Sequence, residues 1–270
     1  MDPKSEAGFD LLQPEAIALA LKAQGFSEHV LRYQATTSST NADVLAHYEA
    51  HGQLAIATSE MQTAGKGRRG RQWHSPYAQN IYCTVAIEKK LSASCLGLLS
   101  IISGIALCEA LAVSGIEGVQ LKWPNDLYFQ GAKLGGILIE SKPTTNNGYF
   151  FAIGFGLNVH MTQAELGSIP QAATSLDLIQ SEVVDRQQVL LAAIAQVLTR
   201  IQQFDEHQVT SLINEFKQYD AFHAQKICVL NGEEEIQGMN LGINQYGHLI
   251  LQTEQGLRNF SAAEISVRGL

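Results

Sequence analysis

The sequence predicts an α+β fold with a small β unit at its C-terminal end. Two strand-like runs, residues 133–140 and 149–159, flank a short polar turn and are typical of a β-hairpin. Helical spacing of apolar residues occurs on both sides of this hairpin, most clearly over 94–113 and 186–206. From residue 226 onward, short strand-like runs alternate with glycine-containing turns. The chain therefore combines a main domain of helices and strands with a C-terminal β segment.

The length of the chain limits the number of domains. A chain of 270 residues can hold one large domain, or one domain with a small appendage. The sequence changes character near Ala221, which divides it into residues 1–222 and 223–270. So short a run of strands favours a small barrel, and an extension of the main sheet is the alternative.

The first two helices have recognisable ends. A helix is predicted over residues 14–24, because a proline stands in its first turn and a glycine follows its last. A second helix is predicted over residues 42–50, after a run of capping residues from 36 to 41 and before Gly52.

The remaining elements follow from apolar periodicity. Alternation with period two predicts strands, and a spacing of three to four residues predicts helices. On this basis strands are predicted over residues 54–59, 80–87, 119–122 and 127–129, and a last helix over 209–219.

Four cations gather on one glycine-rich loop of an otherwise acidic chain. The protein has a formal net charge of −8, yet no Asp or Glu occurs between residues 61 and 87. Lys66, Arg68, Arg69 and Arg71 stand there among three glycines. Glycine lets the backbone approach a ligand, and arginine binds carboxylate or phosphate through two parallel hydrogen bonds. The loop is therefore predicted to hold a small phosphorylated or carboxylated ligand.

Three other interpretations of this loop fit less well. The glycine spacing of residues 65–70 matches the dinucleotide fingerprint, but a strand-like run follows where that motif needs a helix. A Walker A loop needs Lys-Ser or Lys-Thr after its last glycine, where this chain has Arg71-Gln72. General nucleic-acid binding is disfavoured by the overall acidity.

Composition and spacing exclude several further classes. The N-terminus lacks the features of a secretory signal, and no apolar run is long enough to span a bilayer. The four cysteines have no metal-binding or redox spacing, which predicts free thiols in a cytoplasmic protein. His47 and His51 lie four residues apart without the glutamate of a zinc-protease motif, so a solvated helix face is predicted.

Three polar or glycine-rich clusters follow the basic loop. Residues 122–126 (KWPND) place a cation, an amide and a carboxylate at a turn between strands. Residues 133–136 (KLGG) begin one strand, and residues 154–158 (GFGLN) end another. Glycine within a strand marks a bulge or the close approach of a ligand. Each cluster alone fits an ordinary strand end, but together they indicate a binding site.

In this order and spacing, residues 37–41 (TSSTN), 62–73 (QTAGKGRRGRQW), 122–126 and 133–136 resemble the motifs of biotin–protein ligases. The resemblance runs from about residue 36 to residue 159 and continues more weakly to residue 269. It implies a mixed sheet with helices on one side, similar to class II aminoacyl-tRNA synthetases, and a C-terminal SH3-like barrel. It also implies a cytoplasmic, ATP-dependent biotin–[acetyl-CoA-carboxylase] ligase.

The resemblance further implies two half-reactions. The biotin carboxylate attacks the α-phosphate of ATP to give biotinyl-AMP and pyrophosphate, and a lysine of the biotin carboxyl carrier protein of acetyl-CoA carboxylase then displaces AMP. Lys133 and Arg68 are the implied catalytic residues, and Asp126 with Asn125 is the implied Mg²⁺ site. The implied biotin- and ATP-binding residues are Ser39, Thr40, Asn41, Gln62, Gly65, Lys66, Gly67, Arg68, Arg71, Trp73, Lys133, Gly136, Gly154, Gly156 and Asn158.

The sequence departs from the family pattern at two places. Lys66 stands where many relatives carry arginine, which removes the bidentate geometry but keeps the charge. Only 35 residues precede Thr36, and they contain one helix pattern where repressor-type relatives carry a helix-turn-helix domain. We therefore expect a ligase without a DNA-binding module, no specific DNA binding and no membrane association, while the family allows a homodimer. Lipoate or octanoyl ligases, nucleic-acid binders and catalytically silent sensors are the alternative classes.

Overall fold

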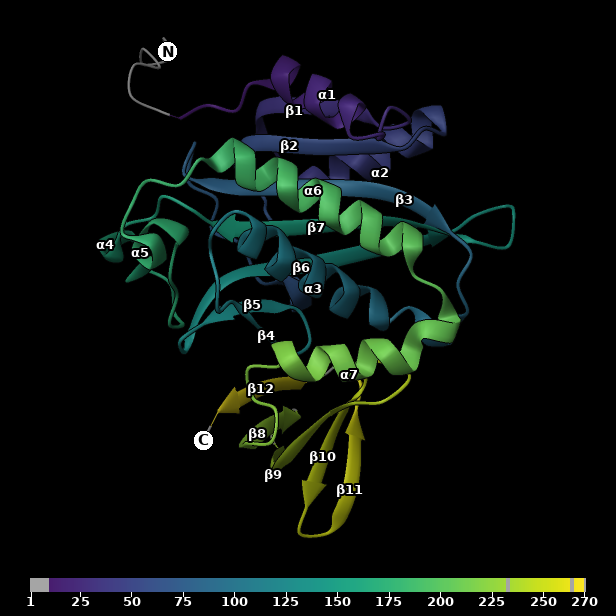
Figure 1. Ribbon diagram of the computed structural model, residues 1–270, viewed down its shortest axis with the longest axis vertical. Coiled ribbons are helices and arrows are strands. Elements are labelled where there is room, and N and C mark those ends of the chain that lie inside the picture. Colours follow the sequence, from purple (N-terminus) through teal and green to yellow (C-terminus); the bar gives the residue numbers. More distant parts are fainter. Residues whose placement is uncertain (1–9, 232–233, 263–264, 270) are drawn as a thin grey trace.

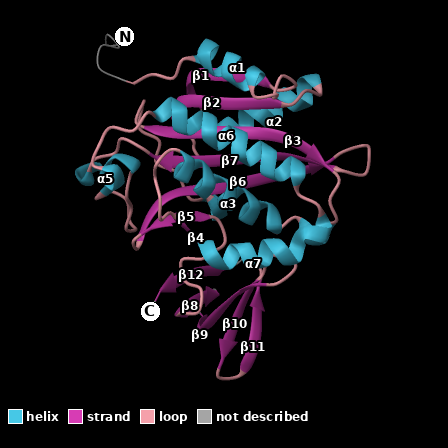
Figure 2. Ribbon diagram, viewed as in Figure 1, coloured by secondary structure: helices cyan, strands magenta, loops and turns pink. Residues whose placement is uncertain are grey.

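Two β-sheets organise the protein, and helices pack mainly against the larger one (Figure 1). The structure, a computed structural model, describes residues 10–231, 234–262 and 265–269. Figure 2 shows the helices and strands of both parts. The helices are α1 (Pro14–Ala23), α2 (Thr40–His51), α3 (Leu98–Val113), α4 (Gln163–Leu166), α5 (Leu176–Gln180), α6 (Arg186–Gln203) and α7 (Val209–Tyr219).

The main sheet is mixed, as expected. Its seven strands lie in the order β1-β2-β3-β7-β6-β5-β4, with β1 and β2 parallel and each other neighbouring pair antiparallel. The strands are β1 (Val30–Thr37), β2 (Ala55–Gln62), β3 (Asn80–Lys89), β4 (Gln120–Lys122), β5 (Asp126–Phe129), β6 (Ala132–Pro143) and β7 (Tyr149–Asn158). The antiparallel pairing of β2 with β3 contradicts the dinucleotide-binding interpretation of the loop between them, which needs a crossover helix.

Most of the predicted elements are present with shifted ends. The predicted hairpin is confirmed as β6 and β7, which pair from Gly135 opposite Leu157 to Pro143 opposite Tyr149. The helix predicted from residue 94 begins at Leu98, after a separate 3-10 turn over Ala93–Cys95. Strand β1 and the short helices α4 and α5 were not predicted.

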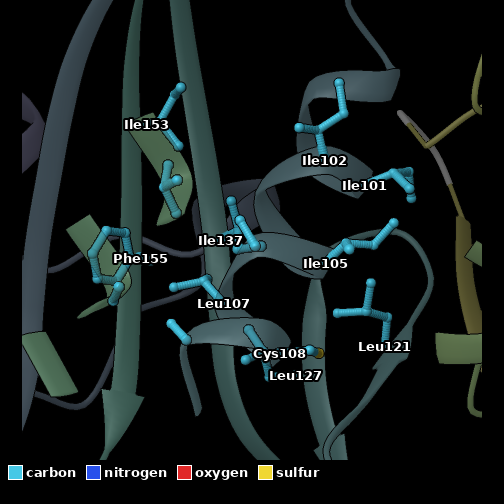
Figure 3. Packing of buried hydrophobic residues seen from close by; sticks show 14 of the residues in the cluster. Ile101, Ile102, Ile105, Leu107, Cys108, Leu121, Leu127, Ile137, Ile153 and Phe155 are labelled. Carbon is cyan, nitrogen blue, oxygen red and sulfur yellow. The ribbon is translucent and has the colours of Figure 1, made fainter. Parts of the chain in front are cut away.

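The two faces of the main sheet are covered differently. Helices α3 and α6 pack on one face through large aliphatic residues, and Figure 3 shows Leu107 of α3 near Ile137 of the sheet. Alternate strand residues point to the opposite face, because side chains alternate along a strand.

The opposite face carries α2, which refines the expectation that helices lie on one side. Its contact surface is built largely from alanines of β2, β3 and β7, together with Val44 and Phe150. Tyr48 of α2 stacks on Phe150 with ring centroids 3.9 Å apart. Alanine leaves space for a helix backbone close to the sheet, so the small residues explain why α2 lies there.

The C-terminal strands form a separate sheet rather than an extension of the main one. Five antiparallel strands lie in the order β11-β10-β9-β8-β12. They are β8 (Lys226–Asn231), β9 (Glu234–Ile243), β10 (Leu249–Thr253), β11 (Gly256–Phe260) and β12 (Ile265–Gly269). Trp123 links the two parts, because its buried indole Nε1 donates to Gly247 O at 2.9 Å.

Within the described ranges, none of the helices combines the length and the apolar character that crossing a membrane requires.

A fully buried ion pair joins several elements of the main domain. Arg186 of α6 and Glu60 of β2 have no exposed side-chain surface, and Arg186 Nη1 lies 2.7 Å from Glu60 Oε2. The other Glu60 oxygen accepts hydrogen bonds from Leu12 N at 2.8 Å and from the Tyr33 hydroxyl at 3.1 Å. Burial, followed by the Glu60 charge, raises the pKa of Tyr33 above its usual range.

Replacing Arg186 with methionine should destabilise the protein strongly. Removing one partner leaves a buried charge without compensation, which costs about 3–5 kcal/mol. The matched control is Arg258→Met, because Arg258 pairs with Glu234 at 3.1 Å at the surface and an exposed pair contributes at most about 1 kcal/mol. Urea denaturation measures both, and equal midpoints for the two variants would contradict the prediction.

Candidate functional site

A pocket of about 800 Å³ opens between the basic loop, the β4–β5 turn and the start of β6. Its remaining walls come from residues 168–173 and from β12 of the second sheet. The lining residues that the structure describes are Arg68, Arg69, Arg71, Gln72, Trp73, His74, Lys122, Trp123, Pro124, Asn125, Asp126, Lys133, Asn158, Ser168, Ile169, Pro170, Gln171, Ala173, Val267 and Arg268. Six of these are Lys or Arg and one, Asp126, is acidic. The pocket therefore suits a polyanion.

The basic loop folds back on itself as a small hairpin. Trp73 N donates to Gly65 O at 2.9 Å, and Gly67 N donates to Arg71 O at 2.7 Å. Arg69 and Gly70 turn the chain with φ of 61° and 70°, in the left-handed region that glycine tolerates best. These bonds direct Arg68, Arg71 and Trp73 to the same pocket wall.

Lys133 and Asp126 form an ion pair inside the pocket. Their Nζ and Oδ1 atoms lie 2.7 Å apart, and both side chains are largely shielded from solvent. The backbone of Lys133 is held on its outer side, since its N–H donates to Ala172 O and its carbonyl accepts from Thr174 N, both at 2.9 Å. The ammonium group thus projects from a rigid strand.

Arg68 connects the basic loop to the β4–β5 turn and to the chain that follows β11. It donates from Nη1 to Asn125 Oδ1 at 3.2 Å and from Nη2 to the carbonyl of Ala262, two residues after β11. Burial, followed by the neighbouring Arg69, lowers the pKa of the Arg68 guanidinium. Burial likewise lowers the pKa of Lys122. A bound anion would offset the repulsion from neighbouring cations that helps to lower both pKa values.

Trp73 lies against strand positions that have no side chains. A Cβ at Gly156 would come within 2.7 Å of Trp73 Cε2, and a Cβ at Gly136 within 3.5 Å of Trp73 Cζ3. Lys133 Nζ lies 5.4 Å from the centre of the indole. The indole Nε1 faces Gly156, is buried and has no hydrogen-bond partner within the described residues.

A second, uncharged cluster lies on the same face of the sheet at the start of α2. Gln62 Oε1 accepts from Thr40 N at 3.0 Å, and Thr84 Oγ1 lies 2.8 Å from Thr40 Oγ1. Thr84 Oγ1 also lies 2.6 Å from Asn41 Oδ1. Gly154 leaves room for Asn41, because a Cβ there would come within 2.1 Å of Asn41 Oδ1.

Most of the residues predicted for the site meet in these two groups. The predicted residues that line the pocket are Arg68, Arg71, Trp73, Asn125, Asp126, Lys133 and Asn158. Thr40, Asn41, Gln62 and Gly154 belong to the uncharged cluster, beside the buried Ser39 at the N-cap of α2. Neighbouring atoms come close to the backbone around the loop and Trp73 at four predicted glycines, Gly65, Gly67, Gly136 and Gly156. Lys66 is exposed and does not line the pocket.

Sequence reasoning missed two walls of the pocket. Residues 168–173 carry no recognisable motif, and they reach the pocket because their C-terminal end bonds to the backbone of Lys133. Arg268 lies in another sheet, far away in the sequence, and only tertiary packing brings it to the pocket. Thr84 was also missed, since it looks like an ordinary buried strand residue.

The residues proposed for Mg²⁺ offer few free oxygen atoms. Asn125 already accepts from Arg68, and its amide nitrogen donates to Ile137 O at 2.8 Å. No group of three or more His, Cys, Asp or Glu side chains suited to a metal occurs within the described ranges. Mg²⁺ usually binds through one or two carboxylates, with waters and substrate phosphates. Asp126 could therefore bind Mg²⁺ together with the phosphates of a nucleotide, but Asp126 and Asn125 do not form a complete metal site on their own.

Gly156→Ala should displace the Trp73 ring, because the added methyl group would overlap the indole. We expect stronger acrylamide quenching of tryptophan fluorescence in this variant. The only other tryptophan, Trp123, is 3% exposed and hence shielded, so the signal reports Trp73. Gly167→Ala is the control, since a Cβ there makes only ordinary contacts of 3.4 Å. Unchanged quenching in Gly156→Ala would show that the ring does not rest on this strand.

Comparison with known proteins agrees with this geometry. Residues 30–158 match the model of the biotin/lipoate A/B protein ligase family, and residues 225–268 match the biotin protein ligase C terminal domain. The chain is 31% identical over 241 residues to the biotin–[acetyl-CoA-carboxylase] ligase of Paracoccus denitrificans, covering 87% of this chain and 99% of that protein. It is also 31% identical over 217 residues to the bifunctional ligase/repressor BirA of Escherichia coli, covering 80% of this chain and 67% of BirA.

A solved structure shares the fold. The biotin protein ligase of Aquifex aeolicus in complex with biotin and ATP superposes with a TM-score of 0.74 at 26% identity, covering 89% of this chain and 99% of that one. Sequence and structure thus lead to the same conclusion: the chain belongs to the biotin protein ligase family.

Proposed function

We propose that this protein is an ATP-dependent biotin–protein ligase that forms biotinyl-AMP and transfers biotin to a lysine of the biotin carboxyl carrier protein of acetyl-CoA carboxylase. The observation that carries the proposal is the pocket in which six cations and one carboxylate adjoin an uncharged hydrogen-bonding cluster. Family membership and relatives named as biotin–[acetyl-CoA-carboxylase] ligases support it.

The first half-reaction must bring two anions together. The carboxylate of biotin attacks the α-phosphate of ATP, the bond to the β-phosphate breaks, and pyrophosphate leaves. We assign Lys133 to the position between carboxylate and α-phosphate, since its ammonium group projects into the pocket from a rigid strand. Arg68 and Arg71 neutralise charge from the loop side. Preorganised cations of this kind stabilise a transition state without reorganising during the reaction.

The second half-reaction needs the activated intermediate to stay bound until the carrier lysine arrives. That amine attacks the acyl carbon, the bond to the phosphate oxygen breaks, and AMP leaves. We propose that the basic loop and Trp73 cover biotinyl-AMP, with Asn158 toward the nucleotide. Mg²⁺, when bound, would neutralise phosphate charge, with Asp126 as its protein ligand and Asn125 beside it.

The remaining assignments are also proposals. We assign residues 1–222 to catalysis and 223–270 to the C-terminal domain, which the two family matches support. A cytoplasmic location is supported by four free, buried cysteines. The net charge of −8 argues against sequence-specific DNA binding by this chain. A homodimer is compatible with the family.

One assay tests the proposed function directly. The protein is incubated with biotin, MgATP and a biotin carboxyl carrier domain, and biotin transfer is detected with streptavidin. We expect a signal that requires ATP and the acceptor lysine. No transfer to any of several carrier domains would disprove the proposal.

Lys133→Ala should slow biotin-dependent release of pyrophosphate by about 10²–10³-fold, the usual cost of losing a preorganised donor. Lys142→Ala is the control, because Lys142 lies on the same strand with an exposed side chain paired with Glu49. Transfer from preformed biotinyl-AMP should fall less, since the bond to the α-phosphate already exists. Adenylation by Lys133→Ala within about threefold of wild type, well below the expected loss, would remove Lys133 from the mechanism.

Arg68→Gly should weaken retention of biotinyl-AMP by about tenfold to a hundredfold, because a charge-assisted hydrogen bond contributes roughly 1.5–3 kcal/mol. The released intermediate should label lysines of a bystander protein such as serum albumin. Lys142→Ala again serves as the control. Equal off-rates of the intermediate from wild type and Arg68→Gly would contradict the assignment.

A further inference from the structure

A chain of four polar side chains runs beneath the uncharged cluster. In order it comprises Glu140 of β6, Asn41 of α2, Thr84 of β3 and Thr40 of α2. Asn41, Thr40 and Thr84 are buried, and Thr84 has no exposed surface. Thr84 therefore does not contact a ligand, and its effect must pass through its neighbours. We refer to these four residues as the buried polar chain.

Glu140 fixes the orientation of the Asn41 amide. The amide nitrogen of Asn41 lies 2.7 Å from Glu140 Oε2 and 3.3 Å from Leu138 O. An ionised carboxylate and a backbone carbonyl can only accept hydrogen bonds. The NH₂ group of Asn41 must face them, so its carbonyl oxygen faces Thr84. Gly154 holds this arrangement in place, since a side chain there would overlap Asn41 Oδ1.

The orientation of Asn41 decides where the hydroxyl protons lie. Asn41 Oδ1 has no proton, so its 2.6 Å contact uses the single hydroxyl proton of Thr84. The 2.8 Å contact between Thr84 and Thr40 is then a hydrogen bond only if Thr40 donates. Gln62 Oε1 is a second possible acceptor for that proton, but its contact with Thr40 Oγ1 is longer, at 3.3 Å, so the 2.8 Å contact with Thr84 is favoured. The two lone pairs of the Thr40 oxygen are then left for a ligand.

We propose that Glu140, Asn41 and Thr84 are positioning residues that fix the Thr40 hydroxyl as a hydrogen-bond acceptor and thereby select a ligand ring that presents an N–H group. This inference rests on the proposed function, in which the ureido ring of biotin lies beside Thr40. A ring oxygen in place of the N–H would face the Thr40 lone pair and be repelled. The buried polar chain thus sets specificity without contacting the ligand.

The test measures selectivity in Thr84→Val, which keeps the shape of the side chain and removes the hydroxyl. Biotin is compared with its two carbamate analogues, in which a ring oxygen replaces one or the other ureido N–H. The readout is kcat and KM of pyrophosphate release for each compound. Wild type should reject one of the analogues by about tenfold to a hundredfold in kcat/KM, the usual effect of an unpaired buried polar group.

Without the Thr84 hydroxyl, the Thr40 proton is free to turn toward the ligand. We expect Thr84→Val to raise KM for biotin about fivefold to tenfold, in keeping with the loss of one oriented hydrogen bond, with a smaller change in kcat. Discrimination against the carbamate should fall by a similar factor. Thr84→Ser keeps the hydroxyl and should restore selectivity. Melting temperatures of both variants separate this effect from loss of folding.

Glu140→Gln provides an independent variant at the half-buried end of the chain. Its amide can donate to Asn41, so the Asn41 amide can flip, although Leu138 O still favours the original orientation. We expect the same loss of selectivity, smaller than in Thr84→Val. If wild type adenylates biotin but Thr84→Val, Thr84→Ser and Glu140→Gln all keep the wild-type preference for biotin over both carbamates, the positioning role is wrong. If wild type does not adenylate biotin at all, the proposed function itself fails.

Discussion

The site depends on three glycines on one face of the main sheet, at positions where a side chain would fill the space. Gly136 and Gly156 are direct partners across β6 and β7, and Gly154 lies two residues along the same strand. Trp73 rests on the first two positions, and Asn41 occupies the space left by the third. The opposite face is filled by the aliphatic residues of α3 and α6 and supplies the apolar core. Because side chains alternate along each strand, one sheet can carry a dense core on one side and a hollow for the site on the other.

The second constraint is the repulsion between the cations around the pocket, and hydrogen bonds to Lys133 and Arg68 hold these side chains in place against it. Like charges in a partly buried space repel each other strongly, and Asp126 is the one carboxylate among the lining residues that the structure describes. Lys133 is held by backbone bonds on its outer side, and Arg68 is held by Asn125 and by the carbonyl of Ala262, which follows β11. These supports keep the charges in place before a ligand arrives. The C-terminal sheet therefore contributes to the pocket directly, as well as through the buried Trp123.

Sequence patterns predicted the parts of this arrangement that are encoded locally. Apolar periodicity identified the hairpin of β6 and β7, and the clusters around Arg68 and Lys133 identified the cationic pocket. Strand β1 was missed because it is an edge strand whose outward residues are polar and exposed, which weakens the alternation. The placement of α2 on the second face depends on alanines in three separate strands, which no single segment reveals. Arg268 reaches the pocket only through packing between the two sheets.

The uncharged cluster and the cationic pocket suit different chemical groups, and the basic loop belongs to both. The uncharged cluster offers hydrogen bonds of defined direction, which suit a neutral polar ring, whereas the cationic pocket suits carboxylate and phosphate. Gln62 belongs to the first and Trp73 to the second, and they stand at either end of the basic loop. Gln62 Nε2 donates to Ser75 Oγ at 3.4 Å, and Ser75 Oγ donates to Trp73 O at 3.1 Å, which closes the base of the loop. Through Ser75, the uncharged cluster is therefore joined by hydrogen bonds to the backbone that supports Trp73.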